Sequence, residues 1–276
     1  MRLLFLGDLV GRSGRNAAVD RLPELRRRYR LDFIVVNAEN AAGGFGITES
    51  ILVDLLEAGA DVVTLGNHAW DQRDALVFIE RQPRLLRPIN YPEGTPGRGA
   101  GLFESRSGHA VLVINAMGRV FMPEMDCPFR AVEREVEACG LGRGADAILV
   151  DFHAEATSEK QALGLYLDGR VSAVVGTHTH TPTADERVLS RGTAYMSDVG
   201  MCGDYNSVLG MRPEEPMNRF LSRIPRERFE PASGAATVCG LAVDIDDATG
   251  LARSATAVRL GGVLTPAEPL TWIEER

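Results

Sequence analysis

Two of the five histidines in this sequence lie in the pentapeptide GTHTH at residues 176–180, with one residue between them. On an extended backbone, residues two apart project to the same side, so both imidazoles would face one small volume. Paired imidazoles of this kind bind metal ions, although an isolated His-x-His also occurs as two structural histidines at a strand end. The rest of the chain decides between these interpretations.

Five short apolar runs, at residues 3–6, 33–36, 62–65, 147–152 and 171–175, are typical of buried strands, and polar residues follow each of them. Ligands of open α/β sheets bind beyond the carboxyl ends of the strands, so we expect these polar groups to meet on one edge. Four of the five histidines are among them, and only His109 stands apart, in a polar loop where a surface residue is expected. The polar groups are Asp8, Glu39, Asn40, Asn67, His68, His153, His178 and His180.

This set of side chains offers nitrogen and oxygen ligands without a thiolate. Such a set disfavours a structural zinc site and favours catalytic Mn, Fe, Co or Zn. The candidates exceed what one ion needs, whereas two ions about 3.5–4 Å apart that share one carboxylate would use them all. Two divalent cations against Asp8 and Glu39 leave a net positive site that attracts a phosphate ester. We therefore expect two divalent metal ions, Fe or Mn ahead of Zn or Co.

The motifs resemble a known family. GD at residues 7–8, GNH at 66–68 and GTHTH at 176–180 resemble the calcineurin-like metallophosphoesterase superfamily. GDLVGRSGR, NAENAAGGFG, GNHAWD, DFHAEATSEK, GTHTHTPTADER and GTAYMSDVGMCG resemble its YmdB-like branch, whose members are described as phosphodiesterases active on 2′,3′-cyclic nucleotides. The resemblance runs from Gly7 to about Gly203 and implies a four-layer α-β-β-α sandwich. It also implies a small phosphodiester or cyclic nucleotide such as 2′,3′-cyclic AMP as the substrate.

The resemblance implies a role for each matching residue. Val10 stands where the wider superfamily usually has a ligand histidine, and Glu39 replaces the usual bridging aspartate. Asn40 compensates for the first of these departures, and both agree with the narrower branch. One ion would be held by Asp8, Glu39, Asn40 and His180, and the other by Glu39, Asn67, His153 and His178, with Glu39 bridging and His68 as the catalytic imidazole.

Phosphoester hydrolysis needs a nucleophile, stabilisation of the phosphoryl charge and a proton for the leaving oxygen. Bound metals supply the first two, and an imidazole can supply the third. We therefore expect a metal-bridging hydroxide to attack phosphorus in line while His68 acts as the general acid. His68 directly follows Asn67, so its side chain can point out of the metal cluster, with a further ligand role as the alternative. Four carboxylates lie in or near the motifs, and each is expected either to orient a ligand imidazole or to serve as an ordinary cap or turn residue: Asp71, Glu155, Asp185 and Asp198.

The elements that must position these residues alternate between short strands and helices. This pattern indicates an α/β fold with substantially parallel strands. The helices are expected at 14–28, after a Thr48 cap, at 131–139 and from a Thr157 or Ser158 cap to residue 167. Strands at 187–189, 193–196, 236–244 and 255–260, with a helix at 214–221, predict a second, more antiparallel sheet. We expect one domain over residues 1–276, with two stacked mixed sheets flanked by helices.

Composition excludes several classes of protein. The chain has 276 residues, 45% of them hydrophobic, and a net charge of -8, which argues against a protein that coats nucleic acid. The basic run at residues 26–30 is interpreted as a solvated helix face. The N-terminal apolar run is too short for a signal sequence, and no segment approaches the ~20 apolar residues of a membrane span. Four widely spaced cysteines, Cys127, Cys139, Cys202 and Cys239, agree with a reducing cytoplasm.

Rival functions make distinct demands. A dinucleotide-binding turn would need the GxGxxG spacing, from which residues 7–14 depart. A metal-dependent amidohydrolase also uses His-x-His, but usually after the first strand of a barrel. A nucleotide sensor without turnover would act through residues 117–130, which we interpret as a loop covering the site, with Arg119 and Phe121 either binding the nucleotide or packing. Apolar residues in the loops are compatible with a homo-oligomer.

Overall fold

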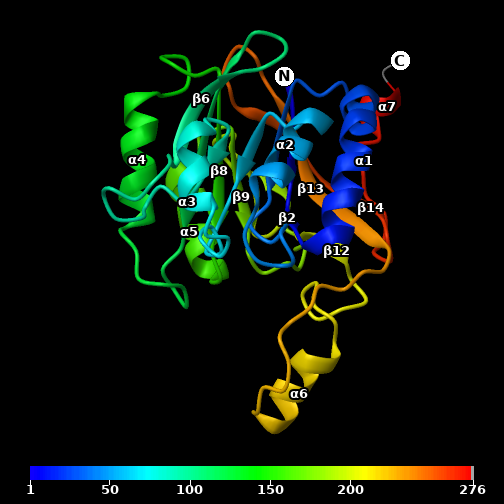
Figure 1. Ribbon diagram of the computed structural model, residues 1–276. Coiled ribbons are helices and arrows are strands. Elements are labelled where there is room, and N and C mark those ends of the chain that lie inside the picture. The colour runs from blue at the N-terminus through cyan, green and yellow to red at the C-terminus, as the bar shows by residue number, and fades with distance from the viewer. Residues whose placement is uncertain (275–276) are drawn as a thin grey trace.

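Two mixed β-sheets form the body of the computed structural model, which describes residues 1–274 (Figure 1). Residues 275 and 276 of the predicted domain lie outside the described residues. The 8-stranded first sheet has the order β2-β12-β13-β1-β3-β4-β5, with β14 paired to β13. Its strands are β1 (Arg2–Leu6), β2 (Asp8–Leu9), β3 (Phe33–Asn37), β4 (Val62–Thr64), β5 (Leu85–Leu86), β12 (Met201–Asp204), β13 (Ala236–Ile245) and β14 (Ala252–Gly261).

The 6-stranded second sheet has the order β10-β11-β9-β8-β7-β6. Its central strands β7, β8, β9 and β11 run parallel, and its two edge strands run antiparallel to their neighbours. The strands are β6 (Ala100–Glu104), β7 (Ala110–Met117), β8 (Ala147–His153), β9 (Ala173–Thr177), β10 (Arg187–Val188) and β11 (Ala194–Met196). The helices are α1 (Gly11–Tyr29), α2 (Glu49–Ala58), α3 (Ala75–Phe78), the 3-10 turn η1 (Ile79–Arg81), α4 (Pro128–Ala138), α5 (Thr157–Leu167), α6 (Glu214–Ser222) and α7 (Thr271–Glu274).

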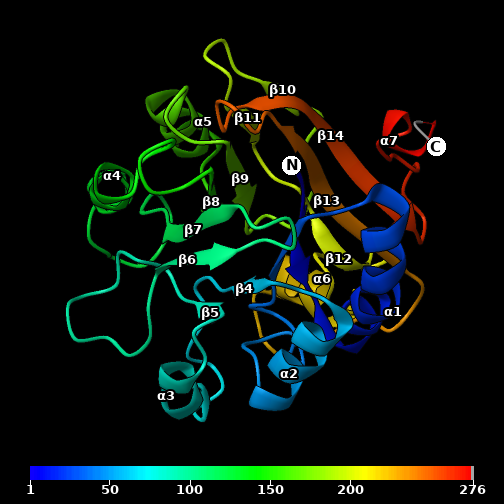
Figure 2. The ribbon, with the colours of Figure 1, turned by 90° about the horizontal axis from the view of Figure 1, so that it is seen from above.

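Alternation along the strands divides the core into layers. Phe5 and Val35 of the first sheet and Val113 and Leu149 of the second belong to one fully buried cluster between the sheets. The opposite faces pack on helices: α1 and α2 cover the first sheet, and α4 and α5 cover the second. Figure 2 shows these helices on the two outer sides of the body. The predicted arrangement of two stacked mixed sheets flanked by helices is confirmed.

The predicted origin of the second sheet is wrong. We expected the C-terminal strands to form it, whereas β12, β13 and β14 belong to the first sheet and only β10 and β11 join the second. Strand β13 pairs antiparallel with β1 on one side and with β14 on the other. Because β13 is buried at nearly every position, it needs strand partners on both edges to satisfy its backbone hydrogen bonds.

Local signals at the helix ends give mixed outcomes. Thr48 caps α2 as predicted, because its hydroxyl accepts a hydrogen bond from the Ile51 amide at 3.4 Å. The predicted cap of α5 is wrong: the N-cap position is Ala156, and no side chain caps that helix. The basic run is not wholly solvated either, since the buried Arg26 donates to the carboxylate of Asp61.

The carboxyl ends of parallel strands from both sheets lie beside one another. Asp151 of β8 accepts hydrogen bonds from Asn37 of β3 at 3.1 Å and from Thr64 of β4 at 2.6 Å. This fully buried carboxylate therefore joins the two sheets near the ends of their central strands. The segment 205–235, which links β12 to β13 and contains α6, projects from one end of the body in Figure 1 and is called the α6 arm below.

None of the helices within residues 1–274 combines the length and the apolar character that crossing a lipid bilayer requires.

Candidate metal centre

The structure brings together all seven predicted ligands and His68. They come from the carboxyl ends of strands in both sheets, so the expectation of a single sheet edge is replaced by two facing edges. Two groups of side chains have ligand atoms within 4.8 Å of one another: Glu39 with His153 and His178, and Asp8 with Glu39 and His180. Glu39 belongs to both groups, as a carboxylate shared by two ions would.

The first group is centred on Nε2 of His153, which is fully buried. Three acceptor atoms surround this nitrogen: Oε1 of Glu39 at 3.1 Å, Oδ1 of Asn67 at 3.0 Å and Nδ1 of His178 at 3.1 Å. Lone pairs that point at one another repel unless a proton or a cation lies among them. The donor set therefore fits a metal ion held by nitrogen and oxygen.

The second group brings together a ring nitrogen of His180 and side-chain oxygens of Asn40 and Asp8. Nδ1 of His180 donates to the carbonyl of Leu209 at 2.9 Å, so Nε2 of the neutral ring keeps its lone pair. That nitrogen lies 3.2 Å from Oδ1 of Asn40 and 3.9 Å from Oδ1 of Asp8. Asn40 donates through Nδ2 to the carbonyl of Gly44 at 2.9 Å, which turns its oxygen toward the site.

Two further observations agree with cations at these positions. Oδ1 of Asp8 is buried and has no hydrogen-bond partner within residues 1–274, and an unpaired buried carboxylate oxygen is costly without a compensating charge. Gly66 leaves the first group open, since a Cβ there would lie 2.3 Å from both Oε2 of Glu39 and Nε2 of His153. Any other residue at this position would fill the space that an ion needs.

The His-x-His pair does not lie on an extended strand, so the premise of that prediction is wrong. Strand β9 ends at Thr177, and His178 and His180 have left-handed φ angles of 101° and 63°. Such conformations cost residues other than glycine of order 1–3 kcal/mol each, and the surrounding structure must maintain them. The two imidazoles consequently enter different ligand groups rather than one.

A buried ion pair maintains this loop. The backbone amide and the hydroxyl of Thr179 donate to Oδ2 of Asp198 at 2.9 and 2.8 Å. The same oxygen accepts a 2.8 Å hydrogen bond from the ammonium of Lys160, and both charged side chains are almost fully buried. Asp198 therefore holds the residue between the two histidines and touches neither imidazole.

Sequence reasoning missed the residues that orient His153. Its Nδ1 lies 2.9 Å from the hydroxyl of Thr177, which donates to Oδ1 of Asp151 at 2.8 Å. The hydroxyl therefore accepts the Nδ1 proton, which leaves Nε2 for a metal. An aspartate inside the otherwise apolar strand 147–153 is the signal that would have revealed this network.

His68 lies outside both ligand groups. Its Nδ1 is 2.8 Å from Oδ2 of Asp71, and its backbone amide donates to Oε2 of Glu39 at 3.1 Å. The ring of Phe45 packs edge-on against the imidazole, with centroids 5.1 Å apart. Nε2 of His68 is therefore the nitrogen left for a substrate.

Glu155 and Asp185 were each predicted either to orient an imidazole or to serve a cap or turn, and the structure gives them different roles. Oε2 of Glu155 lies 3.3 Å from Nε2 of His178, where it can fix that ring with Nδ1 toward the ligand group. Asp185 accepts hydrogen bonds from Ser197 and Thr183 and serves the local turn instead.

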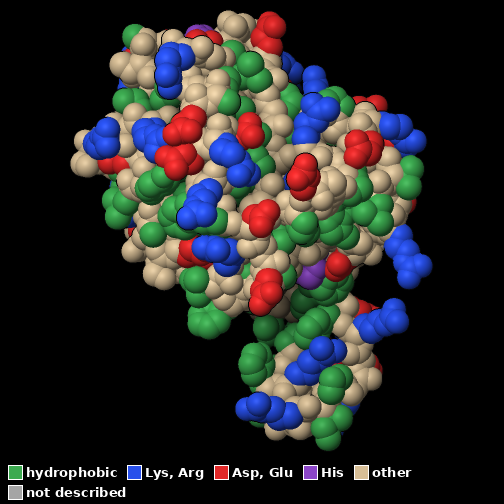
Figure 3. Space-filling model, turned by 90° about the vertical axis from the view of Figure 1, so that its left-hand side faces the viewer, with side chains coloured by type: hydrophobic (Ala, Val, Ile, Leu, Met, Phe, Trp, Pro, Cys, Tyr) green, Lys and Arg blue, Asp and Glu red, His purple; other side chains and the backbone are tan. Residues whose placement is uncertain are grey.

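A cavity of about 710 Å³ opens onto the metal centre. Its wall includes His68 and residues of the α6 arm, and Figure 3 shows histidine and hydrophobic side chains where the arm meets the body. The prediction that residues 117–130 cover the site is wrong, since none of them lines this cavity. Phe121 is 88% exposed, and neither it nor Arg119 is among the residues that line the cavity.

The chain is similar to known proteins along most of its length. A family model described as YmdB-like protein matches residues 4–258. The chain belongs to the YmdB-like family. A relative from Bacillus subtilis (strain 168), named 2′,3′-cyclic-nucleotide 2′-phosphodiesterase, is 49% identical over 250 residues, which cover 90% of this chain and 93% of the relative.

Two solved structures share the architecture of this YmdB-like protein. A hypothetical protein from Thermus thermophilus is 42% identical with a TM-score of 0.88, over 95% of this chain and all of that one. A crystal structure from Mycoplasma pneumoniae described as a novel phosphatase is 34% identical with a TM-score of 0.86, over 100% of this chain and 97% of that one.

Burial and charge set the protonation of the centre of this YmdB-like protein before metal binds. Burial raises the pKa of Asp8, and positive charge on His180 and His153 opposes the rise. Burial also raises the pKa of Glu39, but the charge and hydrogen bond of His153 prevail and lower it to about 2. For His153 burial lowers the pKa, but Glu39 and Asp8 raise it to about 9. Burial, with charge on His153, lowers the pKa of His178 to about 3.

Metal affinity of this YmdB-like protein should depend on pH. A raised pKa means that His153 holds a proton at neutral pH, and metal binding at Nε2 must release it, whereas His178 is already neutral. We expect the apparent affinity for Mn²⁺ to rise about tenfold per pH unit from pH 7 and to level off above about pH 9. Calorimetry in buffers of different ionisation enthalpy measures both the affinity and the protons released. An affinity that stays constant over this range would contradict the assignment.

The Thr177 hydroxyl should matter for metal binding. Thr177→Val keeps the shape of the side chain but removes the partner of Nδ1 of His153, so we expect metal affinity about 10- to 100-fold weaker. Metal titration measures the affinity of the variant, and thermal unfolding checks that the variant is folded. Thr181→Val is the matched control, because the side chain of the exposed Thr181 bonds, among the described residues, to the backbone carbonyl of Thr179 alone. Equal affinities in the two variants would show that the hydroxyl does not orient His153.

Proposed function

We propose that this protein is a metal-dependent phosphodiesterase that hydrolyses small phosphodiesters, 2′,3′-cyclic nucleotides such as 2′,3′-cyclic AMP in particular. One observation carries the proposal: two groups of metal-ligating side chains share Glu39 at the floor of an open cavity. The name of the Bacillus subtilis relative, which is 49% identical, supports the choice of substrate.

The residues divide between two ions in the proposed centre, for which we favour Fe or Mn. Bound there, the ions would acidify water and withdraw charge from the phosphoryl oxygens. Glu39 would bridge the two sites. Asp8, Asn40 and His180 would complete one site, and Asn67, His153 and His178 would complete the other.

His68 is the proposed general acid. Its Nδ1 faces the Asp71 carboxylate, so the ring is fixed with Nε2 available at the cavity wall. As the bond between phosphorus and the leaving ester oxygen breaks, Nε2 would give its proton to that oxygen. The amide contact with Glu39 ties the position of this ring to the bridging carboxylate.

The reaction itself provides the first test. Protein loaded separately with Mn, Fe(II), Co or Zn should convert 2′,3′-cyclic AMP to adenosine monophosphate, as chromatography of the products would show. Binding of the nucleotide without product, under every metal, would identify a sensor instead of an enzyme. Absence of both binding and product would sink the proposal.

His68→Ala should separate chemistry from metal binding. Because His68 lies outside both ligand groups, we expect the variant to keep two metal ions per chain while kcat falls about 10²- to 10⁴-fold. Elemental analysis and steady-state kinetics measure the two quantities. His109→Ala is the control, since His109 bonds to Ser107 far from this centre in the fold. If the variant held only half of the metal and its metal-bound molecules kept the normal kcat, His68 would be a metal ligand instead.

A further inference from the structure

The α6 arm forms one wall of the cavity above the metal centre. Pro216, Arg219 and Phe220 line it at positions i, i+3 and i+4 of α6, which is the spacing of a single helical face, and Arg223 lines it from the C-cap position just beyond the helix. Leu221 is 87% exposed and is not among the lining residues. One face of this helix is therefore turned toward the metal centre.

The arm is built to hold that face in place. Arg219 donates to Oε1 of Glu215 at 2.7 Å and to the carbonyl of Glu227 at 2.9 Å. Glu215 also accepts the backbone amide of Arg226 at 3.1 Å. These contacts fasten the helix to the returning segment of the arm, so α6 has internal support although it projects from the body.

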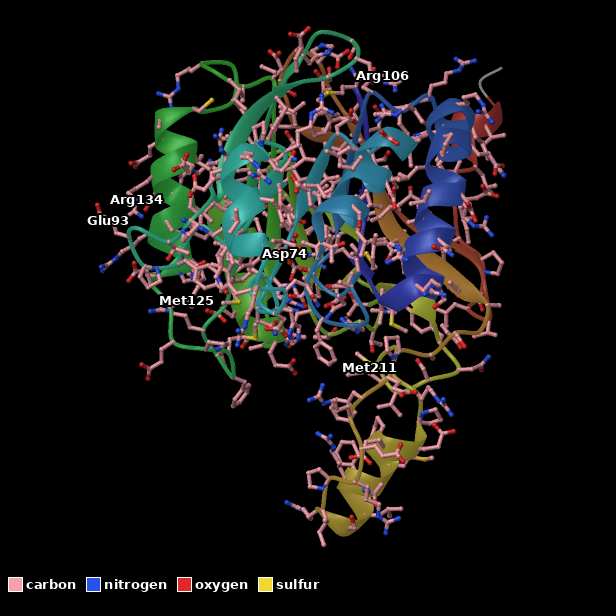
Figure 4. The ribbon with its side chains drawn as sticks, viewed as in Figure 1. Asp74, Glu93, Arg106, Met125, Arg134 and Met211 are labelled. Carbon is pink, nitrogen blue, oxygen red and sulfur yellow. The ribbon has the colours of Figure 1, made fainter. Side chains whose placement is uncertain are left out.

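The base of the arm contacts the metal centre directly. The carbonyl of Leu209 accepts the Nδ1 proton of His180 at 2.9 Å, and Gly44, whose carbonyl binds Asn40, lies close to the Met211 side chain. Figure 4 marks Met211 where the arm leaves the body. The position of the arm is therefore linked to two proposed ligands of one ion.

The three phenylalanines that line the cavity differ in their contacts. The Phe45 ring packs against His68, and the Arg219 guanidinium lies 3.9 Å from the centroid of the Phe229 ring. Phe220 is 82% exposed and has no ring or cation partner within residues 1–274. A large aromatic side chain left open in a substrate cavity is suited to stack on a planar group.

Arg223 adds a positive charge on the arm side of the cavity, where an anion with such a planar group could bind. Arg223 lines the wall and has no ion-pair partner among the described residues. A cavity of about 710 Å³ is within the range that binds a nucleotide-sized ligand. With the phosphate of a nucleotide at the metal centre, the base would be the part that extends toward the arm.

We propose that the α6 arm is the nucleoside subsite and that Phe220 determines specificity by stacking on the base of the substrate. This inference rests on the proposed function and adds the residue that distinguishes a nucleotide from other phosphodiesters. Stacking does not read hydrogen-bond patterns, so Phe220 accepts any base and adds no binding for substrates without one.

Two substrates that differ only in the base test the proposal. For 2′,3′-cyclic AMP, Phe220→Ala should raise KM about tenfold or more with kcat nearly unchanged, since stacking binds ground state and transition state alike. For 1-O-methylribose 2′,3′-cyclic phosphate, which lacks the base, neither constant should change. Leu221→Ala, an equally exposed neighbour outside the cavity, should leave both substrates unaffected.

The remaining outcomes decide against the proposal or against the function on which it rests. An equal effect of Phe220→Ala on both substrates, or no effect on either, would overturn the subsite. A change of oligomeric state in sedimentation, without any change in substrate preference, would assign Phe220 to an interface and also overturn it. If the unaltered protein hydrolysed neither substrate, the proposed function would fail. Calorimetric binding of adenosine monophosphate would then decide the subsite, with tenfold weaker binding by Phe220→Ala supporting it and equal binding refuting it.

Discussion

Two carboxylates, Asp8 and Glu39, are buried where the carboxyl ends of the two sheets meet, and their negative charge is the constraint on which the centre depends. Desolvation makes such a pair costly unless a positive charge lies between the oxygens. Before metal binds, a proton on His153 meets part of this need, because Glu39 and Asp8 raise the pKa of that imidazole. Divalent cations would meet the need more fully, and five further side chains with lone pairs belong to the same two groups or contact them.

The fold holds this arrangement with buried polar contacts that cross between elements. Asp151 accepts hydrogen bonds from both sheets and, through Thr177, fixes the ring of His153. The buried pair of Lys160 and Asp198 holds the loop in which the two other ligand histidines adopt left-handed conformations. Stability of the sheet interface and geometry of the metal centre are thus coupled, since the same hydrogen bonds serve both.

The proposed reaction centre and the proposed nucleoside subsite lie on different parts of the chain. Rigid strand ends carry the ligand groups, whereas the α6 arm carries the exposed aromatic and basic side chains at the rim. This division is common in α/β proteins, where a fixed scaffold positions the chemistry and inserted segments shape the cavity. The contact from Leu209 to His180 joins the two parts, so a shift of the arm would first displace the group formed by Asp8, Glu39 and His180.

The sequence by itself indicated the main buried strands and the identity of the ligand candidates, because buried apolar runs that end in polar residues are local patterns. Only the tertiary structure assigned β12, β13 and β14 to the first sheet. The family resemblance already assigned His178 and His180 to different ions, but only the tertiary structure showed how they separate, by a bend of the chain after Thr177. The tertiary structure alone also showed that Asp151 bonds to Thr177, that the α6 arm lines the cavity and that residues 117–130 do not. Each depends on contacts between residues far apart in the chain, such as Asn37 with Asp151, and no local pattern specifies which distant partner a polar side chain will meet.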